Sequence, residues 1–414
     1  MLIPPLLRES PRFRRFWLGQ TVSFVGDQVS LIALPLVAVL VLDATAAQMG
    51  YLVAAELTPN LLFSLPAGAW ADRRARKRQT MIATDVGRAL ILGSIPVAYA
   101  FDALTFPHML VVAFLMGTLT VLFHVSYSAF YPALVPRDRL VEGGSIMHGS
   151  RALSYVVGPS VGGLLVQAIS APVTLVLDAC SYIVSALFLK TVDVEEPAAE
   201  APGQGHVVAG VRWVFGSPII RAALGATATI NFFNFVFAAL FILYATTELD
   251  VAPGTLGLVL GAAAVGGILG AVVTSRVTRW IGVGPAFALG CVLFPAPLLL
   301  VPLAQGRELV ILTCLFLAEF GAGLGLMMLD ISAGAIAAAV VPARLRSRVS
   351  GAYMVVNYGV RPLGALVGGA LGSWIGLRET LWFATAGALL GVLWLLPSPI
   401  LGLRELPEPE AAPG

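Results

Sequence analysis

Several ionisable side chains interrupt long apolar stretches of this sequence, and they are the first candidates for chemistry. A charge among apolar residues is costly, so such groups usually pair with one another, bind a solute or carry a proton. A carboxylate in a poorly solvated place can take up and release a proton as its surroundings change. The groups of this kind are Asp27, Glu56, Asp85, Arg88, His124, Arg151, Asp178, Glu319, Asp330 and Arg361.

Spacing links some of these groups. Glu319 and Asp330 are 11 residues apart, which on one helix puts them on the same face with about 16 Å between them in depth. Asp85 and Arg88 stand three residues apart and are neighbours on a helix surface. Two interpretations of Asp330 stay open: it is a proton site, or it is the permanent partner of Arg361.

Composition indicates the environment of these groups. The 414 residues are 58% hydrophobic and 12% charged, whereas a soluble domain carries about 25% charged residues. Since a membrane helix needs about 20 apolar residues, charged and Pro/Gly-rich breaks predict an all-α membrane protein of twelve transmembrane helices. The predicted spans are 16–42, 48–70, 79–100, 106–130, 141–168, 171–189, 219–246, 254–275, 280–303, 308–333, 347–374 and 379–402.

Arginine and lysine predict the orientation. With a cytoplasmic N-terminus, 20 of the 25 basic residues fall in inner loops and tails; only Arg307 and Arg378 fall in outer loops, and the other three lie within spans. This asymmetry predicts a multi-pass protein of the bacterial inner (plasma) membrane with both termini in the cytoplasm. Residues 1–189 form one predicted six-helix bundle and 219–403 a second. A cytoplasmic linker at 190–218, with a short amphipathic helix near its end, separates them, and 404–414 is a tail expected to be disordered.

The two predicted bundles resemble each other at a nearly constant offset. An offset of 207 matches Ser10-Pro11 with Ser217-Pro218 and Leu42-Asp43 with Leu249-Asp250. An offset of 206 matches the glycines at 158, 162 and 163 with those at 364, 368 and 369. The chain is therefore interpreted as a parallel duplication of six helices. The same offsets pair Asp27 with Asn234, and His124 with Asp330.

A charged turn follows the second predicted span, from Gly68 through Asp72, Arg73 and Arg76 to Lys77. It is similar to the loop signature of the major facilitator superfamily, except that Ala75 stands where that family has its second glycine. The whole chain resembles this family. The resemblance implies that Gly68, Asp72, Arg73 and Arg76 latch one conformation by bridging to a neighbouring helix end. Asp85 and Arg88 are expected to belong to the same network. The alternative is that the basic residues are ordinary inner-loop charges.

A second signature lies in the fifth predicted span, where Arg151 precedes Gly158-Pro159-Ser160-Val161-Gly162-Gly163. It resembles the core of the motif found in antiporter branches of the superfamily. Small residues allow close helix contact, and proline bends the helix. Ser145 and Ser154 stand where that motif has further glycines, so a generic packing face is the alternative. With Ser23–Asp27, this motif most resembles the macrolide, multidrug and siderophore exporter branch.

The resemblance implies a secondary transporter whose first, fourth, seventh and tenth helices line a central cavity. The side chains expected there, or in proton coupling, are Asp27, Glu56, His124, Asn231, Asn234, Glu319, Asp330 and Arg361. Asp27 is the first choice for the proton site, followed by Asp330 and Glu319. His124 could instead be a packing residue, and Asp178 is expected to be structural. The predicted function is proton-coupled export of amphipathic small molecules, with import by a symporter as the alternative.

Other classes of chemistry lack their signatures. The sequence contains only two lysines, Lys77 and Lys190, and neither follows a glycine, which excludes a phosphate-binding loop for ATP. The three cysteines sit singly in apolar runs, without the spacing of a metal site. We therefore expect no catalytic residues, no metal, no cofactor and no nucleic-acid partner. The expected partners of this monomer are a small-molecule substrate, protons and membrane lipid.

Overall fold

The computed structural model describes residues 4–72, 76–194, 207–342 and 345–405, and every regular element in these ranges is a helix. The short helices are α1 (Pro5–Glu9), η1 (Arg137–Arg139), α8 (Val207–Gly216), η2 (Pro297–Leu299), α12 (Leu300–Leu303), η4 (Leu390–Trp394) and η5 (Pro399–Gly402). The longer ones are α2 (Pro11–Leu42), α3 (Ala46–Asp72), α4 (Lys77–Ala100), α5 (Phe106–Leu134), α6 (Leu140–Ile169), α7 (Ala171–Lys190), α9 (Pro218–Thr247), α10 (Pro253–Ile281), α11 (Val283–Leu293), α13 (Glu308–Val340), α14 (Arg346–Ile375) and α15 (Leu377–Leu389).

Nine segments of the described chain are long and apolar enough to cross a membrane. They coincide with nine of the predicted spans, and the other three predicted spans fall on α3, α14 and α15. Two spans predicted as continuous helices are broken. The span at 280–303 contains α11, η2 and α12, and the span at 379–402 contains α15, η4 and η5. Pro295 and Pro297 accompany the break after α11, and Pro397 and Pro399 lie where the chain passes from η4 to η5, because proline lacks the N–H that a continuing helix needs. No proline lies near the change from α15 to η4 at Leu390.

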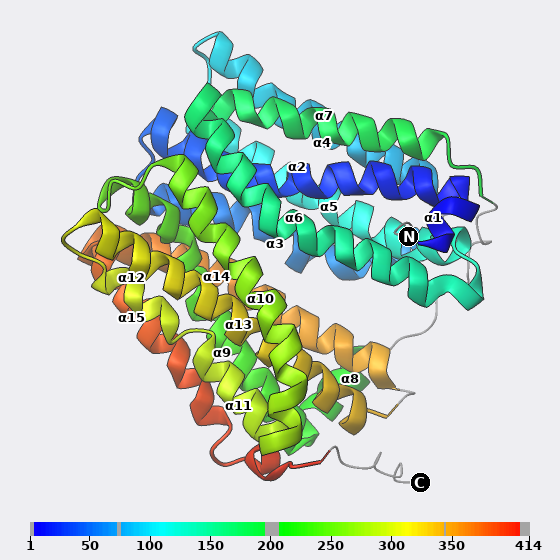
Figure 1. Ribbon diagram of the computed structural model, residues 1–414, viewed down its shortest axis with the longest axis vertical. Coiled ribbons are helices and arrows are strands. Elements are labelled where there is room, and N and C mark those ends of the chain that lie inside the picture. Colours follow the sequence, from blue (N-terminus) through cyan, green and yellow to red (C-terminus); the bar gives the residue numbers. More distant parts are fainter. Residues whose placement is uncertain (1–3, 73–75, 195–206, 343–344, 406–414) are drawn as a thin grey trace. The chain divides into compact units, whose positions relative to one another are not determined.

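The chain divides into two compact units, which are described separately. Unit 1 comprises Met1–Ala44, Ala55–Gly203 and Ala252–Leu258, and unit 2 comprises Thr45–Ala54, Gln204–Val251 and Val259–Gly414. In unit 1, α7 packs against both α2 and α4, and α2 also packs against α6 (Figure 1). In unit 2, α9 packs against α14 and α15, and α11 packs against α13.

The corresponding helices α2 and α9 begin in the same way, and each is followed by a left-handed aspartate, directly after α2 and three residues after α9. Ser10 accepts a hydrogen bond from the Phe13 N–H at 3.2 Å, and Ser217 accepts one from the Ile220 N–H at 3.5 Å. Each serine caps its helix and is followed by proline, which suits the first helical position. At the other ends, Asp43 and Asp250 have left-handed backbones with φ of 48° and 51°. The offset of 207 therefore relates segments with the same local structure.

Helix α6 crosses α2 through two of the motif glycines. A Cβ atom on Gly162 would lie 3.0 Å from the Val29 Cα, and one on Gly158 would overlap the Gln28 side chain. Gly163 faces another direction, toward the backbone of Pro253 and Gly257, which belong to the same unit. The small residues thus let the α6 backbone approach α2 beside Asp27.

A matched pair of substitutions in α6 tests this contact. Gly162→Leu forces a side chain into the Val29 backbone, whereas a Cβ atom on Gly144, in the same helix, would have no neighbouring atom within 4 Å among the described residues. Because overpacking costs about 1–3 kcal/mol, Gly162→Leu should lower the unfolding free energy by that amount. Gly144→Leu should not lower it, because leucine favours the helix more than glycine does. Denaturation in mixed micelles measures both, and equal stabilities of the two variants would contradict the close crossing.

Candidate functional site: a buried ionic network and a polar cavity

The centre of unit 1 holds a fully buried ion pair. Arg88 and Asp85, one turn apart on α4, form a salt bridge with exposed side-chain fractions of 3% and 0%. The Arg88 guanidinium lies between two rings, 4.4 Å from the centroid of Phe123 on α5 and 4.4 Å from that of Tyr182 on α7. Its Nε has no hydrogen-bond partner in the described chain. Arg88 thus neutralises one acid and stacks on two aromatic faces, which is a favourable arrangement for a desolvated guanidinium.

Hydroxyl groups satisfy the remaining oxygens of the buried acids. Ser185 of α7 donates to Asp85 Oδ2 at 2.7 Å and accepts from Gln20 of α2 at 3.0 Å. Asp178, which is also fully buried, accepts from Ser181 at 2.8 Å and from Ser30 of α2.

This approach of α7 to α2 depends on a small residue. A Cβ atom on Gly26 would overlap the Asp178 carboxylate and the Ser181 hydroxyl. Glycine at this position therefore lets the two helices share their polar groups.

Of the three acids in this network, Asp27 is the one that lines a cavity. It accepts a hydrogen bond from the Tyr182 hydroxyl at 2.6 Å. The cavity lies within unit 1, has a volume of about 230 Å³ and is also lined by Ser30, Glu56, Asn60 and Tyr182. Tyr182 therefore contacts Asp27 with its hydroxyl and Arg88 with its ring. Tyr182 thus connects the Asp27 carboxylate with the Arg88–Asp85 ion pair.

Two other candidates in unit 1 lie near enough to this centre to interact with its charges, His124 with Arg88 and Arg151 with Asp27. His124 of α5 is exposed and does not line the cavity; its ring lies 6.3 Å from that of Phe123. Arg151 of α6 is half-buried, with its guanidinium 4.6 Å from the centroid of Phe24. Within the described residues, no three His, Cys, Asp or Glu side chains are arranged to hold a metal ion.

The candidate latch residues are only partly described. Gly68 lies in α3, which ends at Asp72, while the Asp72 side chain and all of Arg73 lie outside the described residues. Arg76 is exposed at the start of α4. Asp85 and Arg88, which were assigned to the same network, lie deep in the bundle instead and interact with α5 and α7.

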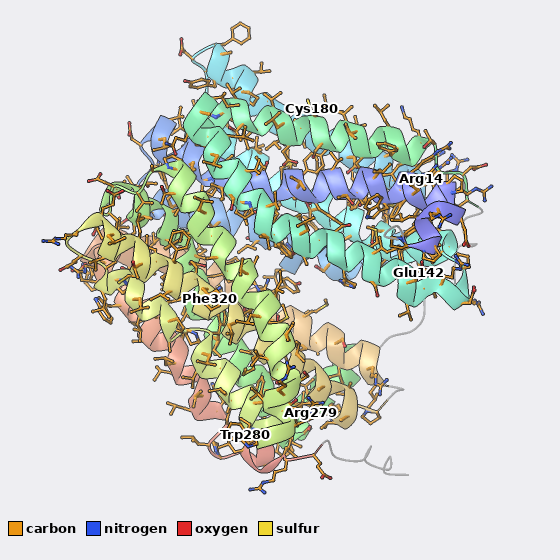
Figure 2. All side chains as sticks on the ribbon, in the orientation of Figure 1. Arg14, Glu142, Cys180, Arg279, Trp280 and Phe320 are labelled. Atoms are coloured by element: carbon orange, nitrogen blue, oxygen red, sulfur yellow. The ribbon has the colours of Figure 1, made fainter. Side chains whose placement is uncertain are left out.

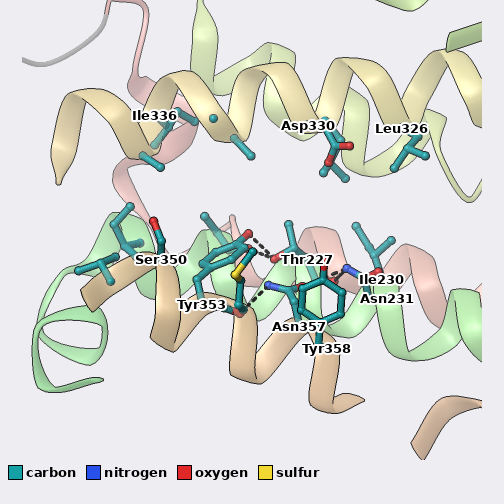
Figure 3. Close-up of a pocket in the computed structure, with 18 of the residues that line it drawn as sticks. Thr227, Ile230, Asn231, Leu326, Asp330, Ile336, Ser350, Tyr353, Asn357 and Tyr358 are labelled. Carbon is teal, nitrogen blue, oxygen red and sulfur yellow. Dashed lines mark hydrogen bonds between the residues drawn. The ribbon is translucent and has the colours of Figure 1, made fainter. Parts of the chain in front are cut away.

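Unit 2 contains a larger cavity of about 800 Å³, built from α9, α13 and α14 (Figure 3). Its wall combines apolar side chains such as Ile230 and Leu326 with polar groups. The polar residues that line it are Thr227, Asn231, Asn234, Asp330, Arg346, Ser350, Tyr353, Asn357, Tyr358 and Arg361. The volume and the mixed lining are typical of a site for a small organic molecule.

Hydrogen bonds between α9 and α14 fix one wall of this cavity. Asn231 donates to the Asn357 side chain at 3.0 Å, and the hydroxyls of Thr227 and Tyr353 lie 2.6 Å apart. On the same wall, Arg361 stacks over Tyr358, with 4.4 Å between guanidinium and ring centroid. These polar groups are held in place before any solute arrives.

The acids of α13 have different surroundings. Asp330 is exposed and points from α13 toward the side where Thr227 and Asn231 lie (Figure 3). It forms no ion pair within 4.0 Å in the described chain, so it is not salt-bridged to Arg361 in this conformation. Glu319, three turns away, is 8% exposed and does not line the cavity.

Several residues of these two sites were not predicted from the sequence, among them Tyr182, Tyr353, Asn357 and Tyr358. Asp178 and Tyr182 are four residues apart on α7, and Tyr353, Asn357 and Arg361 follow one another at the same interval on α14. This spacing puts each set on one helix face. The repeat offset of 206 also pairs Arg151 with Asn357, which is a further signal for that position.

The ion pair can be tested by removing one partner or both. Arg88→Met leaves Asp85 buried without its cation and should destabilise the protein by about 3–5 kcal/mol. Arg88→Met/Asp85→Leu removes both charges and should recover much of that loss. The readout is the free energy of unfolding in mixed micelles, with the exposed Arg137→Gln as control. A double variant less stable than Arg88→Met would contradict this account.

Comparison with known proteins agrees with the helical fold. The chain is 26% identical over 400 residues to the "Multidrug efflux pump Tap" of Mycolicibacterium fortuitum, which covers 92% of this chain and 93% of that protein. It is 27% identical over 239 residues to the "Enterobactin exporter EntS" of Escherichia coli O127:H6, covering 54% of this chain and 55% of that protein. The crystal structure of the nucleoside transporter NupG has the same fold, with a TM-score of 0.77 at 12% identity, over 94% of this chain and 98% of that one.

The sequence profile of the Major Facilitator Superfamily matches residues 16–361 and 224–413. Together with the apolar helices, this match identifies a multi-pass protein of the cell membrane that binds small-molecule substrates and is not an enzyme. The chain belongs to the major facilitator superfamily of transporters.

Proposed function

We propose that this transporter exports amphipathic small molecules in exchange for protons, by alternating access of its two units. The names of two relatives, a multidrug efflux pump and an enterobactin exporter, support export. The observation that carries the proton coupling is the position of Asp27, an acid that belongs to a buried ionic network and also lines a cavity. Drugs, macrolides, siderophores and secondary metabolites are the substrate classes that fit this proposal.

The proposed topology has twelve spans with both termini in the cytoplasm. The three spans beyond the nine apolar ones are α3, α14 and α15. The bundles are proposed to be 1–189 and 219–403, joined by a cytoplasmic linker, and the working form is a monomer. The support for this orientation is the concentration of arginine and lysine in alternate loops.

Charge balance favours Asp27 as the proton carrier. Asp27, Asp85 and Asp178 all interact electrostatically with Arg88, and Asp27 interacts also with Arg151, so three acids face two cations. Uncompensated charge is costly in this environment. Asp85 is ion-paired, and Asp178 accepts two serine hydroxyls. Asp27 receives the Tyr182 hydroxyl and has access to the cavity, so a proton can reach it. Binding a proton there removes one negative charge from beside Arg88, which biases the bundle toward a different arrangement.

The unit 2 cavity is the proposed substrate site. Its apolar wall would contact the apolar part of a substrate, and Asn231, Asn357 and Asp330 would bind the polar groups of that substrate. In the transport cycle, protonation from outside favours release of the substrate, and loss of the proton inside restores binding. Gly158 and Gly162 let α6 contact α2 at Gln28 and Val29, next to Asp27. A movement of α2 that follows protonation of Asp27 would therefore displace α6 as well. The latch formed by Gly68, Asp72, Arg73 and Arg76 remains part of the proposal.

The proton site is tested by Asp27→Asn, which keeps the shape but cannot exchange a proton. Proton-driven substrate transport in proteoliposomes should fall to the level of empty vesicles. The matched control is Asp43→Asn at the end of the same helix, where asparagine tolerates the left-handed backbone. Full coupled transport by Asp27→Asn would refute the assignment.

The direction of transport is tested with labelled drug or siderophore in cells. Cells with the protein should accumulate less solute than cells without it, and an uncoupler should abolish the difference. Higher accumulation in cells with the protein would instead establish the importer alternative. Export that continues in the presence of the uncoupler would overturn proton coupling but not export.

The substrate site is tested by Asn357→Leu, which removes one polar anchor from the unit 2 cavity. Losing one hydrogen bond should raise KM about 2- to 10-fold. The turnover number should stay unchanged because Asp27 and its network lie in unit 1. Asn60→Leu, in the unit 1 cavity, is the comparison variant and should leave KM unchanged. Unchanged KM in Asn357→Leu would contradict the assignment.

A further inference from the structure

A second hollow of unit 2 lies at the end of α10, with residues the candidate substrate cavity does not use. It has a volume of about 920 Å³ and is bounded by α10, α13 and the segment after η5. The residues that decide its chemistry are Thr274, Arg279, Trp280, Ile331, Ser332 and Arg404. Figure 2 shows Arg279 and Trp280 at the end of α10.

Backbone contacts hold Arg404 at this hollow. The Gly284 N–H donates to the Leu403 carbonyl at 2.9 Å, which ties the last described segment to the turn between α10 and α11. Gly282 makes that turn with φ of 95°, and a Cβ atom on it would lie 2.7 Å from the Arg404 Cα. The fold thus brings Arg404, far away in sequence, to the same hollow as Arg279.

The two arginines are available for an anion. Within the described residues, neither Arg279 nor Arg404 has a carboxylate within 4.0 Å, although Glu405 also lines the hollow. Trp280 beside them is 88% exposed. Tryptophan is enriched where a membrane helix meets the head-group layer, so this end of α10 has the character of that layer.

A buried hydroxyl marks the inner part of the hollow. Ser332 of α13 is 1% exposed, yet its Oγ has no hydrogen-bond partner in the described chain. Thr274 opposite already donates to the Gly270 carbonyl at 2.6 Å. Ser332 stands eight residues before the end of α13, about 12 Å inward at 1.5 Å per residue. A ligand that reached both Arg404 and Ser332 would therefore be elongated along the helices.

An exposed apolar stripe continues from the hollow along α10. Leu269, Val272 and Val265 are 44%, 53% and 48% exposed, and their spacing of three to four residues puts them on the face that also carries Ser275 and Arg279. Ile331, which lines the hollow on α13, is 40% exposed. The hollow therefore changes from cationic to hydroxyl-lined to apolar with depth.

We propose that this hollow binds an anionic phospholipid. Arg279 and Arg404 hold the phosphate of the head group, since arginine pairs with phosphate through paired N–H donors. Ser332 donates its hydroxyl proton to a glycerol ester carbonyl, and an acyl chain lies along Val272 and Leu269. Basic pockets between membrane helices bind anionic lipid head groups in this manner. The ligand is a lipid of the surrounding bilayer and is distinct from any transported substrate.

The test uses the full chain in a nonionic detergent and native mass spectrometry with two lipids that share acyl chains, phosphatidylglycerol and phosphatidylcholine. The wild-type protein should retain phosphatidylglycerol roughly 10- to 30-fold better, from two arginines at the membrane surface. Arg279→Gln/Arg404→Gln should reduce this preference to near parity. The control pair Arg12→Gln/Arg137→Gln removes two exposed arginines of unit 1 and should leave it unchanged. Ser332→Ala should weaken phosphatidylglycerol retention about 3- to 5-fold.

Three results would overturn the proposal. The first is an unchanged preference in the Arg279/Arg404 double variant, since the arginines would then not hold the head group. The second is an equal loss of preference in the control pair, which would show a general effect of net charge. The third is displacement of the lipid by inorganic phosphate at equal concentration, because the hollow would then be a site for a free anion.

Discussion

The burial of Arg88 among three carboxylates is the constraint on which unit 1 is built. A guanidinium without water needs charge partners and flat surfaces, and here one helix supplies Asp85 while two others supply the rings of Phe123 and Tyr182. Each acid in turn draws hydroxyls from α2 and α7. The helices therefore meet through polar groups, with Gly26 leaving the space for them. A packing scheme of this kind responds to the gain or loss of one proton, which a purely apolar core cannot do.

The two units share their helix ends and differ in their interiors. Ser10 with Asp43 and Ser217 with Asp250 frame α2 and α9 in the same way, through a serine cap and a left-handed aspartate. Inside, unit 1 places a buried ion pair and serine hydroxyls, whereas unit 2 has amides, phenols and the charged Asp330 and Arg361 around an open cavity. The charges of unit 1 are thus paired within the bundle, and those of unit 2 line a space that a solute can enter.

The helical architecture was readable from the sequence because lipid imposes a simple length rule. Apolar runs and charged breaks predicted where the helices lie, and nine of the predicted spans coincide with segments that are apolar enough to cross a membrane. They did not predict the changes of helix type within the 280–303 and 379–402 spans, where the run stays apolar. The ionisable residues were also found, since each is rare in its surroundings. Their grouping was not predicted: Asp85 and Arg88 were assigned to the latch network near one end of a helix, and Tyr182 was overlooked. Which face of a helix meets which neighbour depends on packing between distant segments, and a list of polar positions does not contain that information.

The hydrogen bond from the Gly284 N–H to the Leu403 carbonyl makes the segment after η5 part of the folded structure of unit 2. Through this hydrogen bond and the close approach of Gly282 to Arg404, residues up to Arg404 pack against the turn between α10 and α11. A purification tag or fluorescent fusion is therefore best attached beyond Glu405. A truncation that removed Leu403 and the residues after it would break the hydrogen bond from Gly284 and remove the backbone that packs against Gly282.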